Sequence, residues 1–276
     1  MLFGKKNLLM RKNKEYQALE KGILIFGNEF TALMQYFDNE FKRIAKRVGA
    51  EERKYPTLIS RDILKRVEFF SSFPEFATYI EPLNHTKTPK YLLQPAVCYH
   101  SYSELTNSKL TKDFYILTAV GNCFRFEGKA LTDSPERLWD FTMREIIFFG
   151  SSKKVTEIRK RLVTEVIWFV NKLGLTSHLE EATDPFFLGT SRGKLLIQKL
   201  KKLKQELRAP LTSKKNIAIA SFNNHEGFFT EKTNIRLPNK KFAHSGCVAF
   251  GLERWAYVFL TKYGADKKKW PKSIKI

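Results

Sequence analysis

The sequence predicts an α+β fold, in which helices flank one extended, mostly antiparallel sheet. Strand-like segments are separated by long connections, and helical segments lie among them without a regular strand–helix alternation. The sequence shows no internal repeat, low-complexity tract or Pro/Gly-rich linker that would divide the chain. We therefore expect one continuous globular unit, in which residues 1–70 form a helical segment packed on a core of residues 71–276.

Amphipathic periodicity locates the predicted helices. Apolar residues recur at close to helical spacing between Leu19 and Phe41, which predicts a long helix over residues 15–48. A second long helix is predicted over residues 154–173, because its apolar residues share one face and Gly174 supplies its end. Shorter helices are predicted over residues 62–70, 194–203 and 253–263.

Short apolar segments rich in β-branched and aromatic residues locate the predicted strands. The segment 114–126 is the clearest of them, although Gly121 interrupts it. The segment 141–149 ends at Gly150, where a run of small residues begins. Further strands are predicted over residues 92–102, 217–222 and 247–250, and near Leu207.

The composition excludes several classes of protein. About 43% of the residues are apolar and 14% are aromatic, which excludes a disordered chain. The three cysteines Cys98, Cys123 and Cys247 are too few, and odd in number, for a disulfide framework. The longest apolar runs are about five residues, whereas a membrane span needs ~20, and the N-terminus lacks the apolar region of a signal peptide. We expect a cytoplasmic protein with no membrane partner.

The charge of the chain points to a polyanionic partner. Lys and Arg number 49 against 28 Asp and Glu, a formal net charge of +21. The basic residues gather in residues 1–14, 192–208 and 262–275. Nucleic acid and an acidic protein both fit such a surface, and a Lys-rich surface without a specific partner is a third explanation.

One strand-like fragment carries an Arg and a Glu two residues apart. If the strand continues, Arg125 and Glu127 share one face, and Phe124 and Phe126 share the other. An Arg–Glu pair of this kind can act on a nucleotide, with Arg on a phosphate and Glu accepting from an exocyclic amine. The alternative is a surface ion pair between strands.

Two further fragments complete the set. Residues 137–145 follow a polar loop and lead into a Phe-bearing strand. In residues 244–254 a strand of small residues turns at Gly251 into a helix, which places Arg254 in the first helical turn. Glycine at such a junction permits close approach of a ligand.

Taken together, these fragments resemble the second and third signature motifs of class II aminoacyl-tRNA synthetases. Residues 92–98 stand where the seryl-tRNA synthetase branch has its amino-acid-recognition strand, with Cys98 in place of the usual Glu. The chain is most similar to the zinc-dependent archaeal seryl enzymes and to their truncated homologues, the amino acid:[carrier protein] ligases. The resemblance covers roughly residues 70–265 and implies a class II synthetase-like catalytic core.

The resemblance implies a zinc site. Both zinc-dependent groups bind the ion through two Cys and one Glu, and Cys98, Glu145 and Cys247 stand at the matching positions. Two thiolates and a carboxylate leave a fourth tetrahedral position open, which an α-amino group can fill. The alternative is that the cysteines are small buried hydrophobes, as we expect for Cys123.

The resemblance also assigns an ATP site. Arg125 is expected on the α-phosphate and the carboxylate, Arg254 on the far phosphates, and Glu127 on the adenine or its neighbour. Phe141 and Arg254 are expected to enclose the ring. Glu206 is the remaining acidic candidate for Mg²⁺, because Ile217 or Ala218 occupies the usual position of the magnesium-binding acid.

Two loop residues and two prolines complete the expectations. Asn223 is expected to contact the amino acid, whereas His225 fits a substrate loop and a packed core histidine equally well. Pro74 and Pro82 are candidates for the dimer-interface proline of the first class II motif, so a homodimer is inferred from the family.

The resemblance implies activation of a small amino acid (glycine, alanine or serine) by ATP and transfer to the phosphopantetheine thiol of an acidic carrier protein. Alternatives are a tRNA-charging seryl-type enzyme, a non-catalytic regulatory module, and transfer to a small molecule or peptide. An acidic carrier fits the basic surface better than tRNA, because no tRNA-reading domain is recognisable in the sequence.

Overall fold

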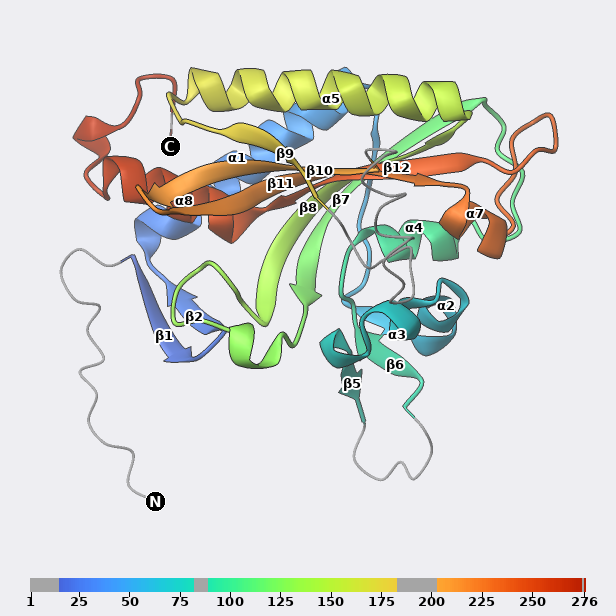
Figure 1. Cartoon of the computed structure of the whole chain (residues 1–276), viewed down its shortest axis with the longest axis horizontal. Helices are drawn as coiled ribbons and strands as arrows, with labels where there is room; N and C mark the ends of the chain where they lie inside the picture. The colour runs from blue at the N-terminus through green and yellow to red at the C-terminus, as the bar shows by residue number, and fades with distance from the viewer. Residues whose placement is uncertain (1–14, 82–88, 183–202, 275) are drawn as a thin grey trace.

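A computed structural model describes residues 15–81, 89–182, 203–274 and 276 (Figure 1). The predicted helix 194–203 therefore lies outside the described residues, apart from Leu203. The basic segment 1–14, most of the basic segment 192–208 and Pro82 lie outside them as well.

A seven-stranded sheet forms the centre of the molecule, in the order β3-β7-β8-β12-β11-β10-β9. Only β3 and β7 run parallel, and the other neighbouring pairs are antiparallel. The predicted mostly antiparallel sheet is therefore confirmed. Its strands are β3 (Glu51–Arg53), β7 (Phe114–Phe124), β8 (Asp140–Gly150), β9 (His178–Glu181), β10 (Lys204–Thr212), β11 (Lys215–Glu226) and β12 (His244–Gly251).

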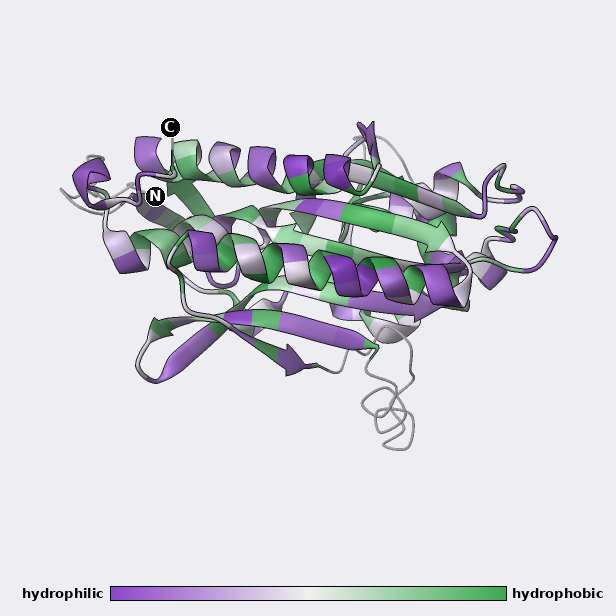
Figure 2. Ribbon diagram, turned by 90° about the horizontal axis from the view of Figure 1, so that it is seen from above, coloured by the Kyte–Doolittle hydropathy of each residue, from purple (hydrophilic) through white to green (hydrophobic). Residues whose placement is uncertain are grey.

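Three helices cover one face of this sheet: α1 (Asn28–Arg47), α5 (Ser152–Lys172) and α8 (Leu252–Tyr263) (Figure 1). Each buries an apolar face, as the periodicity predicts, and Figure 2 shows polar residues along the outer side of the layer above hydrophobic strands. Among the described residues, no helix is both long and apolar enough to cross a membrane.

The opposite face of the sheet carries smaller elements. A three-stranded sheet of β4 (Leu58–Ser60), β6 (Tyr91–Leu93) and β5 (Thr78–Ile80) lies there with short helices (Figure 1). Along β8, Ile146 and Phe148 pack beneath the long helices, whereas Ile147 and Phe149 pack in a second core on this opposite face. The short helices are α2 (Arg61–Arg66), α3 (Phe69–Ser72), α4 (Cys98–Glu104) and α7 (Phe228–Lys232).

The predicted helix over residues 15–48 is wrong in its first part. Residues 16–26 form a hairpin of β1 (Tyr16–Glu20) and β2 (Ile23–Phe26), and the helix begins only at Asn28. Gly22 turns the hairpin at φ +80°, a conformation that favours glycine. Its backbone N–H donates to the Thr132 carbonyl at 2.8 Å, and its carbonyl accepts from Trp139 N–H at 2.9 Å. Pairing with a distant loop therefore decides a segment whose apolar spacing is ambiguous.

The predicted strand over residues 92–102 is also wrong beyond its start. Strand β6 ends at Leu93, and helix α4 begins at Cys98. Pro95 lies between the two elements and has no N–H with which to continue a strand ladder. Strand β7 likewise ends at Phe124, so the alternation that would place Arg125 and Glu127 on one face does not reach them.

Candidate functional site

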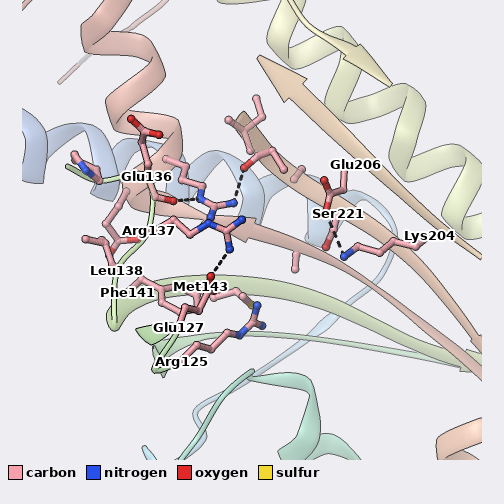
Figure 3. A pocket seen from close by; sticks show the side chains of 18 residues that line it. Arg125, Glu127, Glu136, Arg137, Leu138, Phe141, Met143, Lys204, Glu206 and Ser221 are labelled. Carbon is pink, nitrogen blue, oxygen red and sulfur yellow. Dashed lines mark hydrogen bonds and ion pairs between the residues drawn. The ribbon is translucent and has the colours of Figure 1, made fainter. Parts of the chain in front are cut away.

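Two adjoining cavities lie at the large sheet, on the face away from α1, α5 and α8. The smaller, which we call the amino-acid cavity, has a volume of about 80 Å³ and contains the Cys98–Glu145–Cys247 cluster. The larger, which we call the nucleotide cavity, has a volume of about 130 Å³ and is lined by Arg125, Glu127 and Arg137 (Figure 3). Both names follow the roles that the resemblance implies, and Arg254 lines the larger cavity as well. The residues that line both are Arg125, Met143, Lys204, Ser221 and Ala249.

The cluster in the amino-acid cavity combines three elements. Cys98 is the first residue of α4, Glu145 lies on β8, and Cys247 lies on β12. All three side chains are buried, and their ligand atoms lie within 4.8 Å of one another. The backbone N–H of Cys98 donates to Glu145 Oε2 at 2.6 Å, so the start of α4 brings the first cysteine to the carboxylate.

The cluster is electrostatically unfavourable for three anions. The Cys98 thiol shares a hydrogen bond with Cys247, and this contact with burial raises its pKa well above the usual range. Burial raises the pKa of Glu145. The Cys98 contact lowers the pKa of Cys247, but burial and the Glu145 carboxylate outweigh it, so the net shift is upward. A divalent cation would remove this repulsion, and two thiolates with one carboxylate suit Zn²⁺.

A buried ion pair fixes the strand that carries Glu145. Arg144 points to the opposite face, where its Nη2 donates to Asp38 Oδ2 on α1 at 2.9 Å and its Nη1 donates to Thr118 Oγ1 at 3.1 Å. The Thr118 hydroxyl in turn donates to the Glu145 carbonyl at 2.9 Å. The backbone beneath the cluster is thus held from the helical layer.

Two residues of β11 contact the cluster from below. Asn223 lines the amino-acid cavity, and its Nδ2 lies 3.4 Å from Cys247 Sγ, while its contact with an amino acid stays a prediction. His225 is fully buried, and burial lowers its pKa to about 3. Its Nε2 lies 3.7 Å from Cys247 Sγ. His225 is therefore a packed core histidine that also contacts the cluster.

Arg125 stands at the junction of the two cavities. Its Nε donates to the Pro95 carbonyl at 2.8 Å, and its guanidinium lies over the Phe141 ring at 5.4 Å from the centroid. Phe141 therefore packs against Arg125 here, while Arg254 lines the same cavity from α8. The structure brings these residues into one cavity, and their roles toward ATP stay predictions.

Arg254 is anchored at the nucleotide end. Its Nε donates to the Glu136 carbonyl at 2.9 Å and its Nη1 to the Ala218 carbonyl at 3.0 Å. Burial lowers its pKa to about 10. Glu127 pairs with Arg137 from the following loop rather than with Arg125, so an ion pair between segments is present at Glu127.

Glu206 is already paired with cations. Its carboxylate lies 3.2 Å from Lys204 Nζ and 2.9 Å from Arg208 Nη1. A Mg²⁺ ion at Glu206 would have to exchange with these partners. Lys204, a member of the basic segment 192–208, lines both cavities.

Sequence reasoning also missed Glu253, which is buried at the start of α8. Its Oε1 accepts the Thr142 backbone N–H at 2.7 Å, and burial raises its pKa to about 7. The signal was present in the fragment 244–254, where Glu253 precedes Arg254 at the helix start.

The fold resembles solved synthetases. It superimposes on M. kandleri SerRS, solved with A. aeolicus tRNASec, with a TM-score of 0.81 at 20% identity over 93% of this chain and 56% of that one. It superimposes on a cytoplasmic serine-tRNA ligase from Naegleria fowleri, solved with AMP, with a TM-score of 0.72 at 14% identity, covering 88% and 57% of the two chains. The chain thus spans little more than half of these structures, and its fold is that of a class II aminoacyl-tRNA synthetase core.

Sequence comparison gives the family. The chain is 30% identical over 253 residues to amino acid–[acyl-carrier-protein] ligase 1 of Bradyrhizobium diazoefficiens, covering 83% of this chain and 77% of the relative. It is 24% identical over 289 residues to the type-2 serine–tRNA ligase of Methanococcus aeolicus, covering 92% of this chain and 55% of the relative. No model of a protein family matches the chain. The chain belongs to the amino acid–[acyl-carrier-protein] ligases, as its motifs predict.

Proposed function

We propose that this ligase condenses a small amino acid with ATP to an aminoacyl-adenylate and transfers the acyl group to the phosphopantetheine thiol of an acidic carrier protein. The observation that supports this best is the junction of the two cavities at Arg125. One cavity offers a cluster suited to a cation that binds amines, and the other offers Arg254 and Phe141. The family to which the chain belongs supports the same reaction.

Cys98, Glu145 and Cys247 are the residues that would hold Zn²⁺. An ion with three protein ligands supplies one open position, where a free α-amino group can bind. The amino-acid cavity is small, with a volume of about 80 Å³. This space favours glycine, alanine or serine over a larger side chain.

The first step joins the two cavities. A carboxylate oxygen of the amino acid attacks the α-phosphorus of ATP, and pyrophosphate leaves. Arg125 would neutralise the negative charge that develops between the carboxylate and the α-phosphate. Arg254 would hold the far phosphates and, with Phe141, the adenine. Glu127 would read the adenine or its neighbour, and Glu206 would bind Mg²⁺.

The second step transfers the acyl group. The thiolate of the phosphopantetheine arm attacks the carbonyl carbon, a thioester forms, and AMP leaves. A further cavity that shares residues with the nucleotide cavity is lined by six cationic side chains and three acidic ones: Arg125, Arg137, Lys204, Arg208, Lys215 and Arg254, with Glu127, Glu136 and Glu206. These charges, with the formal net charge of +21, suit an acidic carrier protein.

The first experiment measures ATP–pyrophosphate exchange with each of the twenty amino acids. We expect exchange with one or a few small ones. If none supports exchange, the ligase reaction is excluded and a non-catalytic role for the chain gains support. Zinc content by mass spectrometry, measured on the same preparation, tests the metal site separately.

The second experiment separates the acceptors. Labelled amino acid is offered to a holo-carrier protein and to tRNA. We expect transfer to the carrier thiol, with a rate that falls as salt rises, while adenylation is insensitive to salt. Transfer to tRNA alone would favour the second candidate, a tRNA-charging enzyme, which the similarity to type-2 serine–tRNA ligases supports.

Family resemblance also supports a homodimer in the cytoplasm. Pro74 is the described candidate for the interface proline, and it begins a short 3₁₀ turn after Phe73. Sedimentation equilibrium of the purified chain tests the dimer, because a monomer at micromolar concentration would contradict it.

A further inference from the structure

A buried chain of three polar side chains leads to the metal-binding cluster from behind. His225 Nε2 lies 3.7 Å from Cys247 Sγ, and its Nδ1 lies 2.8 Å from the Tyr102 hydroxyl. That hydroxyl lies 3.0 Å from Ser245 Oγ. Tyr102 comes from α4, His225 from β11, and Ser245 from β12, so three separate elements converge on this line.

All three side chains are shielded from water. The exposed fractions are 0% for Tyr102 and Ser245 and 5% for His225. Buried polar groups are expensive unless they are hydrogen-bonded. The histidine, the phenol and the serine therefore depend on hydrogen bonds to one another, which fixes their mutual geometry.

The heavy-atom positions allow two proton arrangements. In one, Tyr102 donates to Ser245 and accepts from His225 Nδ1–H, so Nε2 is left to accept from a Cys247 thiol. In the other, the Tyr102 hydroxyl turns its hydrogen away from Ser245, to which it donates in the structure, and donates to Nδ1, so His225 Nε2–H points at the Cys247 sulfur. Both need only rotation of two hydroxyls and a change of imidazole tautomer.

We propose that His225 is a positioning residue for the metal site: oriented by Tyr102 and Ser245, it donates Nε2–H to the Cys247 sulfur when that sulfur is a metal-bound thiolate. The inference rests on the proposed metal site. Asn223 Nδ2, at 3.4 Å, is a second donor to the same sulfur. Such outer hydrogen bonds fix a ligand's orientation and tune the metal.

The consequence concerns the amino group of the substrate. A thiolate that accepts hydrogen bonds gives less electron density to its metal, which leaves the ion a better acceptor for a fourth ligand. His225 would then strengthen amine binding without touching the amino acid.

The test uses the full chain loaded with Co²⁺ in place of Zn²⁺, because cobalt gives a sulfur-to-metal charge-transfer band. His225→Leu removes the donor, so we expect the band at longer wavelength and zinc affinity weaker by about 10–100-fold. His225→Gln keeps an amide donor and should restore most of both. Tyr102→Phe should give a smaller shift of the same sign.

His100→Leu is the matched control. Like His225, His100 is a buried histidine. It lies on α4, and its ring stacks on Tyr55, with the centroids 5.3 Å apart. We expect its band to match that of the wild type.

An unshifted band and unchanged zinc affinity in His225→Leu would overturn the inference. If this variant fails to fold, His225→Gln and Tyr102→Phe provide the test. A wild-type cobalt band and zinc affinity in Tyr102→Phe would count against the orientation of His225 by Tyr102. If the wild type takes up no stoichiometric metal, the proposed metal site falls and the inference falls with it. The two failures are therefore distinguishable.

Discussion

The two ends of the site handle charge in opposite ways. At the amino-acid end, Cys98, Glu145 and Cys247 are three buried acidic groups whose pKa values are all raised. At the nucleotide end, three of the four acidic groups that line the cavity have cationic partners: Glu127 pairs with Arg137, Glu136 with Lys215, and Glu206 with Lys204 and Arg208, whereas Glu253 is buried without one among the described residues.

The difference shows what each end is built to receive. The amino-acid end holds acidic groups close together in a dry pocket, an arrangement that a cation stabilises. The nucleotide end is more exposed, and most of its acidic groups already have cationic partners, so in the proposed reaction an arriving nucleotide would exchange partners with existing ion pairs. A cation would thus stabilise the acidic cluster at the amino-acid end, whereas a nucleotide would replace existing ion pairs at the nucleotide end.

The largest effect is expected at the amino-acid end. Cys98→Ser should reduce pyrophosphate exchange to background and weaken zinc binding by more than about 100-fold, the upper value for outer-shell changes. Cys123→Ser is the matched control, because Cys123 is also fully buried but lies outside the cluster. Zinc content and exchange are measured on both, and a metal-free Cys98→Ser enzyme with normal exchange would contradict the zinc proposal.

A second effect is expected where the two ends meet. Arg125→Lys should lower exchange by about 10²–10³-fold, because a point charge does not reproduce the guanidinium fork at the reacting centre. The thermal midpoint should change little. Arg236→Lys is the control. Arg236 also lies over an aromatic ring, 4.0 Å from the Phe242 centroid, but it lines neither the amino-acid cavity nor the nucleotide cavity. Equal losses in both variants would show a general effect of removing arginine.

A third effect concerns Glu253 and pH. Burial raises the pKa of Glu253 from 4.5 to about 7, so between these values the folded chain keeps a proton that the unfolded chain releases. The free energy of unfolding therefore falls as pH rises through this window and stays lower above it.

Glu253→Gln should remove this fall. The difference in unfolding free energy between pH 5 and pH 8 should shrink by up to about 3 kcal/mol. Urea denaturation of the metal-free protein at both pH values measures it. An unchanged difference would mean that Glu253 ionises normally in the folded protein.

The smallest effect is expected for the paired acid of the nucleotide end. Glu206→Gln breaks contacts with Lys204 and Arg208 that are only partly buried, so stability should change by less than about 1 kcal/mol. If Glu206 binds Mg²⁺, the Mg²⁺ concentration that gives half-maximal pyrophosphate exchange should rise several-fold in this variant. Glu165→Gln, which breaks a pair with Arg47 on the helical face, should leave it unchanged.

Sequence patterns predicted the long central elements well. The strands that became β7 and β8 and the helix that became α5 are confirmed, because each has a continuous apolar pattern of the right period. The strand-to-helix turn at Gly251 is also found, with α8 beginning at Leu252. The motifs placed residues from four distant segments in one site because the resemblance supplied the topology.

Short segments could not be predicted in the same way. The hairpin of residues 16–26 depends on bonds to Thr132 and Trp139, and local spacing carries no information about them. The partners of Glu127 and His225 are likewise set by other elements, namely the loop that carries Arg137 and the helix that carries Tyr102. Contacts between elements far apart in the sequence therefore determine the structure of these short segments and the partners of these side chains.

The N-terminal hairpin has a consequence for product release. Gly22 is bonded to both Thr132 and Trp139, so the hairpin holds the two ends of the loop that carries Glu136 and Arg137. A Cβ at Gly22 would come within 3.1 Å of Trp139 N. The loop cannot move outward alone without breaking these two hydrogen bonds. In the proposed reaction, AMP would therefore leave either past a closed loop or when the hairpin and the loop move together.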